Sequence, residues 1–176
     1  PPRSTLFPYT TLFRSVQLRL LEEADLPKTL QWRNRDGIRN YFFHSDVLIF
    51  EQHQQWWQKY VPKDDDFVFV IELLEEGQRW PVGQVALYAV NWQEKTAEYG
   101  RLMVGEDRAR GRGVAQRATK LVLQIGFDVL NLEEVHLEVF AHNQVARHVY
   151  ERCGFHLVEE LDTVVKMSIR KADFRR

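Results

Sequence analysis

Short segments of the chain alternate between hydrophobic and polar residues, and this pattern predicts strands. The first runs from Val16 to Leu20, and a strand at 67–73 is joined by a turn at 75–77 to a partner at 82–90. Further strands are predicted at 96–104, 135–140, about 155–160 and 163–169. Most neighbouring strands are separated by short connections, which favours an antiparallel sheet.

Apolar residues at helical spacing predict the remaining elements. Asp25 and Pro27 mark the start of a helix that passes through Leu30 and Trp32. Two short helices are expected at 36–43 and 51–60, and a long amphipathic helix at 114–130. Asn143 is a suitable N-cap for a last helix, and Gly154 is a suitable C′ residue after it. The set predicts an α+β domain with a mixed, mostly antiparallel twisted sheet flanked by helices.

The length of 176 residues suits one domain, and we expect it to span residues 16–176. A formal net charge of −1 argues against a general nucleic-acid binder. The single cysteine, Cys153, permits a reducing compartment, so a cytoplasmic location is expected. No apolar run has membrane-spanning length, and no histidine and cysteine cluster has the spacing of a metal site, so neither a membrane nor a metal partner is expected.

The first fifteen residues are interpreted separately. The stretch from Thr5 to Ser15 resembles the in-frame translation of a DNA-sequencing adapter, and the chain begins without methionine. We therefore expect residues 1–15 to be a non-native, dispensable tail rather than part of the domain. A targeting peptide and a native apolar arm are the alternatives.

Residues 108–115 have the composition of a phosphate-binding loop between a strand and a helix. The order R-x-x-G-x-G places Gly111 and Gly113 where the backbone must turn tightly and can direct several N–H groups at one anion. The dipole of the following helix adds positive potential. The P-loop NTPase motif is absent, and the dinucleotide fingerprint fails because Gln116 replaces its third glycine. A pyrophosphate site is the leading interpretation, and a basic helix entrance with a glycine hinge is the alternative.

A second motif, N-x-x-A-x-x-x-Y-x-x-x-G-F, runs from Asn143 to Phe155. Together the two motifs, in this order, resemble the GNAT superfamily of acetyl-CoA-dependent N-acetyltransferases over residues 16–171. The resemblance implies a sheet that splays between its fourth and fifth strands, where acetyl-CoA enters as cosubstrate. The residues that it implies for coenzyme binding are Met103, Val104, Arg108, Ala109, Arg110, Gly111, Arg112, Gly113, Val114, Ala115, Asn143 and Ala146.

Acetyl transfer to an amine needs a base, a stabilised oxyanion and an acid for the thiolate. By motif position, the resemblance implies Tyr150 as the acid and a backbone N–H near Met103 or Val104 for the oxyanion. Glu138 and Glu98, both within predicted strands near the splay, are the candidates for the base. A water chain is the alternative, and His53, His142 and His148 are weaker candidates. Tyr150 as a core residue and both carboxylates on a solvated face are the structural alternatives.

The N-terminal third is expected to bind the acceptor, which is a small-molecule amine. Trp32, Arg33, Asn34, Phe42 and His53 are the candidate residues, within a W-R-N and a downstream F-E-x-H pattern. These patterns resemble bacterial amino-sugar acetyltransferases that act on a UDP-linked 4-amino sugar. Aromatic residues suit stacking on uracil or a sugar, and arginine suits a diphosphate. Packing within two amphipathic helices is the structural alternative for the same aromatic residues.

Three other functions remain open. They are a ribosomal-type protein N-terminal acetyltransferase, an aminoglycoside or other small-amine acetyltransferase, and a sensor that binds acyl-CoA without turnover. A homodimer is also left open.

Overall fold

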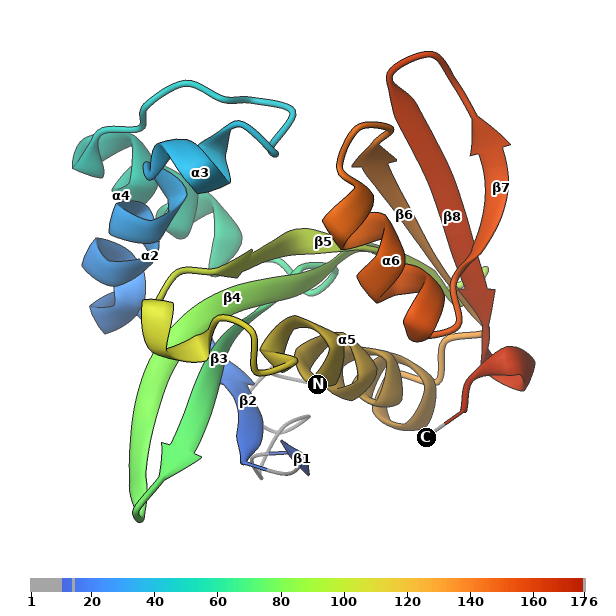
Figure 1. Cartoon of the computed structure of the whole chain (residues 1–176), viewed down its shortest axis with the longest axis horizontal. Helices are drawn as coiled ribbons and strands as arrows, with labels where there is room; N and C mark the ends of the chain where they lie inside the picture. Colours follow the sequence, from blue (N-terminus) through green and yellow to red (C-terminus); the bar gives the residue numbers. More distant parts are fainter. Residues whose placement is uncertain (1–10, 14, 176) are drawn as a thin grey trace.

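The strands of the chain form one twisted sheet with helices on both of its faces (Figure 1). The computed structural model describes residues 11–13 and 15–175. Within these ranges the strands are β1 (Thr11–Phe13), β2 (Val16–Leu20), β3 (Phe67–Glu75), β4 (Gln78–Asn91), β5 (Thr96–Val104), β6 (Glu134–Phe140), β7 (His156–Glu160) and β8 (Val164–Arg170). Their order across the sheet is β1-β2-β3-β4-β5-β6-β8-β7.

The helices lie where the apolar periodicity predicts them. They are α2 (Leu26–Arg33), α3 (Asp36–Arg39), α4 (Phe50–Tyr60), α5 (Val114–Gln124) and α6 (Gln144–Arg152), with short turns η1 (Glu23–Asp25), η2 (Asp107–Ala109) and η4 (Lys171–Asp173) and a π-helical segment η3 (Ile125–Val129). Helices α2, α3 and α4 gather on one side of the sheet, while α5 crosses the opposite face (Figure 1). The sheet therefore separates two layers of helices.

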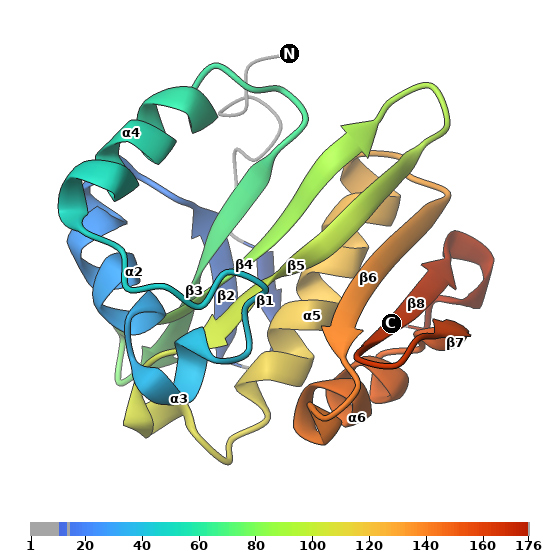
Figure 2. The same cartoon turned by 90° about the horizontal axis from the view of Figure 1, so that it is seen from above.

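One pair of described strands, β5 and β6, is parallel, and these two strands separate along part of their length. Strand β5 pairs with β6 only from Thr96↔Glu134 to Glu98↔His136, although both strands continue beyond these residues. Figure 2 shows β5 and β6 diverging toward the end where α3 and α6 lie. All the other pairs are antiparallel. The predicted α+β fold, with its splay between the fourth and fifth predicted strands, is confirmed.

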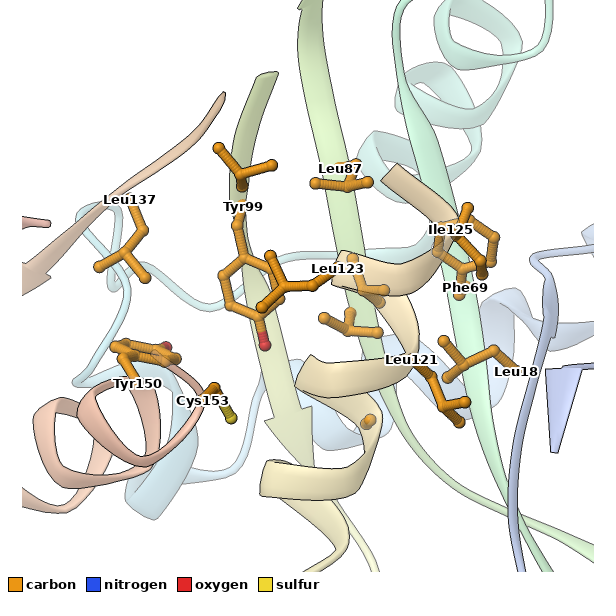
Figure 3. Close-up of a cluster of buried hydrophobic side chains, with 14 of the residues drawn as sticks. Leu18, Phe69, Leu87, Tyr99, Leu121, Leu123, Ile125, Leu137, Tyr150 and Cys153 are labelled. Carbon is orange, nitrogen blue, oxygen red and sulfur yellow. The ribbon is translucent and has the colours of Figure 1, made fainter. Parts of the chain in front are cut away.

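A large apolar core fixes α5 and α6 against the sheet. Leu121 and Leu123 of α5 are almost fully buried against Leu87 and Tyr99 of the central strands (Figure 3). At about 25 cal/mol per Å² of apolar area removed from water, such burial is the main stabilising term. A smaller cluster on the other face holds α2 and α4 through Leu26, Tyr60 and their partners on β3 and β4. The two clusters thus hold helices against both faces of the sheet.

Two helices differ from their predicted extents. The helix predicted at 36–43 ends at Arg39, because Phe42 stacks on the Arg33 guanidinium at 4.1 Å and Phe43 meets the ring of Phe140 at 4.8 Å. The helix predicted at 114–130 leaves the α-helical pattern after Gln124 and continues as η3.

The tail predicted at residues 1–15 falls mostly outside the described residues. Within it, Thr11–Phe13 pair with residues 16–18 of β2. The dispensability of residues 1–15 stays a prediction.

Candidate active site

A bulge in β5 exposes its backbone beside the splay. Gln84 pairs with Met103 and Ala86 with Gly100, so two residues of β5 face one residue of β4. Arg101 within this bulge has φ of 53°, a conformation that non-glycine residues seldom adopt. Gly83 allows the strands to approach here, because a Cβ at this position would lie 2.2 Å from the Met103 carbonyl oxygen. The bulge turns residues 101–104 toward the gap between β5 and β6.

The gap itself is a hollow of about 310 Å³, which we name the splay hollow. Helix α3 and the segment after it line one side of this hollow, and the start of α6 lines another. Its lining residues are Gly37, Ile38, Tyr41, Phe42, Phe43, Tyr88, Tyr99, Gly100, Arg101, Leu102, Met103, Val104, Glu138, Val139, Phe140, Asn143, Ala146 and Tyr150. The predicted residues Met103, Val104, Asn143 and Ala146 are therefore brought together here, with Tyr150 and Glu138.

A second hollow, of about 320 Å³, lies at the N-terminus of α5, and we name it the loop hollow. It is lined by Val104, Ala109, Arg110, Gly111, Gly113, Val114, Ala115, Gln116, His148, Val149 and Arg152. Gly111 and Gly113 have φ of 69° and 68°, and no described atom lies within 4 Å of where a side chain at either would begin. The first N–H groups of a helix have no partner within it, so open space in front of them fits a phosphate group.

The arginines of the loop do not all reach this hollow. Arg110 lines it, but Arg108 stacks on the Trp80 ring at 4.1 Å. Arg112 forms an ion pair with Glu75 on the β3–β4 hairpin, which also lies 3.9 Å from Arg108. Arg108 and Arg112 contact Glu75 and Trp80 and do not line the loop hollow, so their contact with the coenzyme stays a prediction.

A third hollow, of about 450 Å³, lies between the sheet and helices α2 and α4, and we name it the acceptor hollow. Thr29, Arg33, Phe42, His44, Leu48, Gln52, His53, Trp56, Gln84, Arg101 and Met103 line it. It shares Phe42, Arg101 and Met103 with the splay hollow, which in turn shares Val104 with the loop hollow. The three hollows therefore adjoin in series along the end of β5.

Two of the predicted acceptor residues make contacts within the protein. Trp32 is fully buried, its indole N–H donates to Glu106 at 2.8 Å, and it lies against Gly105. The Asn34 side chain donates to the Leu48 carbonyl at 2.8 Å and accepts from the Leu48 N–H at 2.9 Å. Both side chains are occupied by these contacts and neither lines the acceptor hollow, so their contact with the substrate stays a prediction.

Arg33, Phe42 and His53, the other candidate acceptor residues, line the acceptor hollow. The Arg33 guanidinium stacks on Phe42 and donates through Nη2 to the His44 carbonyl, whereas its buried Nη1 finds no hydrogen-bond partner among the described residues. Burial, and secondarily the nearby Arg39 charge, lower the Arg33 pKa. The His53 ring stacks on Trp56 and lies 3.0 Å from Thr29 Oγ1, and burial lowers its pKa.

Tyr150 extends from α6 into the splay hollow, beside Tyr99, Leu137 and Cys153 (Figure 3). Its ring is edge-on to Tyr99 at 5.6 Å, and it is only 8% exposed. Burial raises the pKa of its phenol, so the group is protonated at neutral pH. The helix that carries it is fixed by Asn143, whose side chain accepts from the Ala146 N–H at 3.2 Å. Tyr150 is thus both a core residue and a phenol at the hollow.

The two candidate carboxylates have different positions. Glu138 is exposed but lines the splay hollow, opposite Lys166 in the ladder between β6 and β8. Glu98 does not line the hollow and lies opposite Tyr88, its cross-strand neighbour. Tyr88 was missed by the sequence reasoning because a tyrosine within an alternating strand carries no distinguishing signal. The weaker candidates His142 and His148 are exposed, and His148 lines the loop hollow.

The described residues include no group of three or more metal-ligating side chains that could hold an ion. Among the same residues, no helix is long and apolar enough to cross a membrane.

Comparisons with known proteins agree with this geometry. The family model described as an acetyltransferase (GNAT) domain matches residues 15–156. A spermidine N(1)-acetyltransferase of Vibrio cholerae is 31% identical over 149 residues, covering 82% of this chain and 83% of that protein. An Escherichia coli spermidine N(1)-acetyltransferase is 33% identical over 147 residues, covering 84% of this chain and 76% of that protein.

Solved structures extend the comparison. The Vibrio cholerae spermidine N-acetyltransferase in complex with CoA and spermine superposes with a TM-score of 0.79 at 27% identity, covering 92% of this chain and 98% of that one. An apo nucleotide-linked sugar GNAT gives a TM-score of 0.81 at 23% identity, covering 94% and 92%, which is a likeness of fold. The chain therefore belongs to the GNAT acetyltransferase family and is an acetyl-CoA-dependent N-acetyltransferase.

Proposed function

We propose that the amine acetylated by this enzyme belongs to a nucleotide-linked amino sugar held in the acceptor hollow. The observation that carries the proposal is the charge of that hollow. Its lining includes the guanidinium groups of Arg33 and Arg101, and no carboxylate is among the described residues that line it. The Asp66 carboxylate offsets the charge of Arg101 through contacts of 2.7 and 3.1 Å. Arg33 has no such ion-pair partner among the described residues.

An acceptor with phosphate oxygens complements this lining. Guanidinium groups bind phosphate through paired hydrogen bonds, and Arg33 Nη1 is a buried donor without a described partner. Phe42 and Trp56 supply aromatic surface for a base or a sugar face. A polyamine, by contrast, would bring several positive charges beside these arginines without a lining carboxylate to offset them, which low-polarity surroundings make costly.

The roles that we propose for the other residues follow the order of the hollows. The backbone at Gly111 to Ala115 and Arg110 would bind the coenzyme pyrophosphate, since they border the loop hollow. A backbone N–H at Met103 or Val104, beside the β5 bulge, would stabilise the oxyanion. Tyr150 would donate its proton to the departing sulfur, because burial keeps the phenol protonated.

A polyamine is the second candidate acceptor. The relatives at 31% and 33% identity are spermidine acetyltransferases, so their names favour the small-amine alternative over the amino sugar. The two candidates differ in charge, and this difference makes them separable by experiment.

The test compares Arg33→Gln with Arg39→Gln as a matched control. Arg39 is close in sequence but pairs with Asp36 and does not line the acceptor hollow. With a UDP-linked 4-amino sugar, Arg33→Gln is expected to lower kcat/KM by about 10- to 100-fold, the range for a lost charge-assisted hydrogen bond of about 1.5–3 kcal/mol. Arg39→Gln should have little effect. The sugar proposal would be overturned if the wild-type enzyme acetylated spermidine efficiently but not the sugar, and if Arg33→Gln left the spermidine activity unchanged or raised it.

A further inference from the structure

Tyr88 lies between the splay hollow and a carboxylate, although neither sequence motif includes it. It lies on β4 directly opposite Glu98 on β5, so the two side chains extend from the same face of the sheet, and the Glu98 carboxylate raises the pKa of the phenol. The side chain also lines the splay hollow, where β5 and β6 part. The Tyr88 side chain therefore borders the hollow and is the cross-strand neighbour of an exposed carboxylate.

The surroundings of Tyr88 hold its hydroxyl in this position. The Arg101 guanidinium lies 4.4 Å from the centre of the Tyr88 ring, and it donates a hydrogen bond to the buried Asp66 carboxylate. Gly100 lets the β5 backbone approach the phenol, since a Cβ there would lie 3.0 Å from Tyr88 Oη. The β5 bulge that shapes the splay hollow thus also positions Tyr88.

We propose that Tyr88 relays the proton of the acceptor ammonium to Glu98, and that this pair is the proton exit of the active site. The N–H bond of the ammonium breaks and a new O–H bond forms on Tyr88, while the original phenolic proton passes to the Glu98 carboxylate. The amine becomes neutral, Tyr88 is unchanged, and Glu98 becomes a carboxylic acid that releases the proton to solvent. A hydroxyl can donate and accept at once, which this transfer requires.

The relay needs both members. Burial and the neighbouring Glu98 raise the pKa of Tyr88 to about 12, so its phenolate is scarcely populated at neutral pH and the phenol alone is a poor base. Glu98 alone does not reach the splay hollow. The other charged or titratable groups that face Tyr88 are Arg101 from β5, Glu138 from β6 and Tyr150 from α6.

Glu138 is the rival acceptor, because it lines the hollow directly and lies near Tyr88. Its ladder partner is Lys166, which is 2.9 Å from Glu159. In our proposal Glu138 contributes negative potential and is not required for the transfer. The inference rests on the proposed use of the splay hollow as the place of acetyl transfer.

Kinetics test the relay with whichever amine the wild-type enzyme accepts. Tyr88→Phe and Glu98→Gln are each expected to lower kcat by about 10²-fold or more, with little change in acetyl-CoA affinity and loss of the acidic limb of the kcat profile. The double variant should be no slower than either single one, because the residues act as a unit. Glu138→Gln is the matched control and should keep the acidic limb. Loss of the limb in Glu138→Gln alone, or wild-type kcat in Tyr88→Phe, would overturn the relay.

A spectroscopic readout is independent of turnover. In protein labelled with ¹³C at the tyrosine ζ carbon, the Tyr88 resonance, assigned from Tyr88→Phe, should shift when Glu98 titrates. That step should vanish in Glu98→Gln and persist in Glu138→Gln, and its persistence in Glu98→Gln would overturn the inference. Failure of all amines in the kinetic assay, with this titration intact, would count against the proposed acceptor and not against the Tyr88–Glu98 pair.

Discussion

The phosphate-binding role of the loop predicts a sharp response to Gly113→Asp. Gly113 is the N-cap of α5, with φ of 68° and open space where a side chain would begin. An aspartate can adopt this backbone conformation better than most residues, at a cost of about 1 kcal/mol. Its carboxylate would enter the open space in front of the first N–H groups of α5. The substitution therefore places negative charge where the coenzyme pyrophosphate is expected to bind.

The size of the effect follows from charge. A carboxylate about 5 Å from a phosphate oxygen repels it by about 3 kcal/mol at an effective dielectric constant of 20. Residues 111–113 are exposed, so solvent and salt reduce this value toward about 1–2 kcal/mol. The expected loss of acetyl-CoA affinity is therefore about 10-fold at physiological salt and closer to 100-fold at low salt.

Isothermal titration with acetyl-CoA at two salt concentrations measures this loss. Gly113→Ala is the matched control, because it carries the same backbone strain without the charge and should bind within a few-fold of wild type. A thermal melt of each variant verifies folding. An unchanged Kd in folded Gly113→Asp, or equal losses in both variants at both salt concentrations, would refute the assignment of the loop.

Three further predictions follow from the same geometry. Tyr150→Phe should lower kcat by about 10²–10⁴-fold while acetyl-CoA binding, measured by titration, stays near wild type; normal turnover would remove its role as acid. Because burial lowers the His53 pKa, the unfolded chain binds the proton more readily, and stability is present above pH about 6.5 and falls as pH drops through that value. Urea unfolding at pH 7.5 and 5.5 should therefore show a smaller acid loss in His53→Asn than in wild type, and equal losses would contradict it. Deletion of residues 1–15 should leave activity and the melting temperature nearly unchanged, and a chain that no longer folds would show that the tail belongs to the domain.

The elements were predictable wherever local residues determine them. The strand at Thr96–Val104 has its predicted bounds, and the cap at Asn143 and the positive φ of Gly154 follow from residue type alone. The glycines of the loop were likewise readable, because a tight turn and close approach of an anion require them. These features need no knowledge of the tertiary structure.

The positions of long side chains could not be read in the same way. Arg108 and Arg112 turn toward the β3–β4 hairpin because Glu75 and Trp80, more than twenty residues earlier, compete for them. Trp32 is buried through its contacts with Gly105 and Glu106, which come much later in the sequence. Such pairings depend on the folded arrangement, so composition and spacing carry no sign of them.

The most direct test of the account is the release of coenzyme A from acetyl-CoA by the wild-type enzyme with a panel of amines. The panel contains a UDP-linked 4-amino-4,6-dideoxy sugar, spermidine, an aminoglycoside and a ribosomal-type N-terminal peptide, with product masses recorded. Our account predicts a kcat/KM for the nucleotide sugar that exceeds those of the other amines by at least about 10²-fold, equivalent to about 2.7 kcal/mol. Preference for spermidine or another amine would contradict the proposed acceptor, and acetyl-CoA binding without turnover of any of them would contradict the account as a whole.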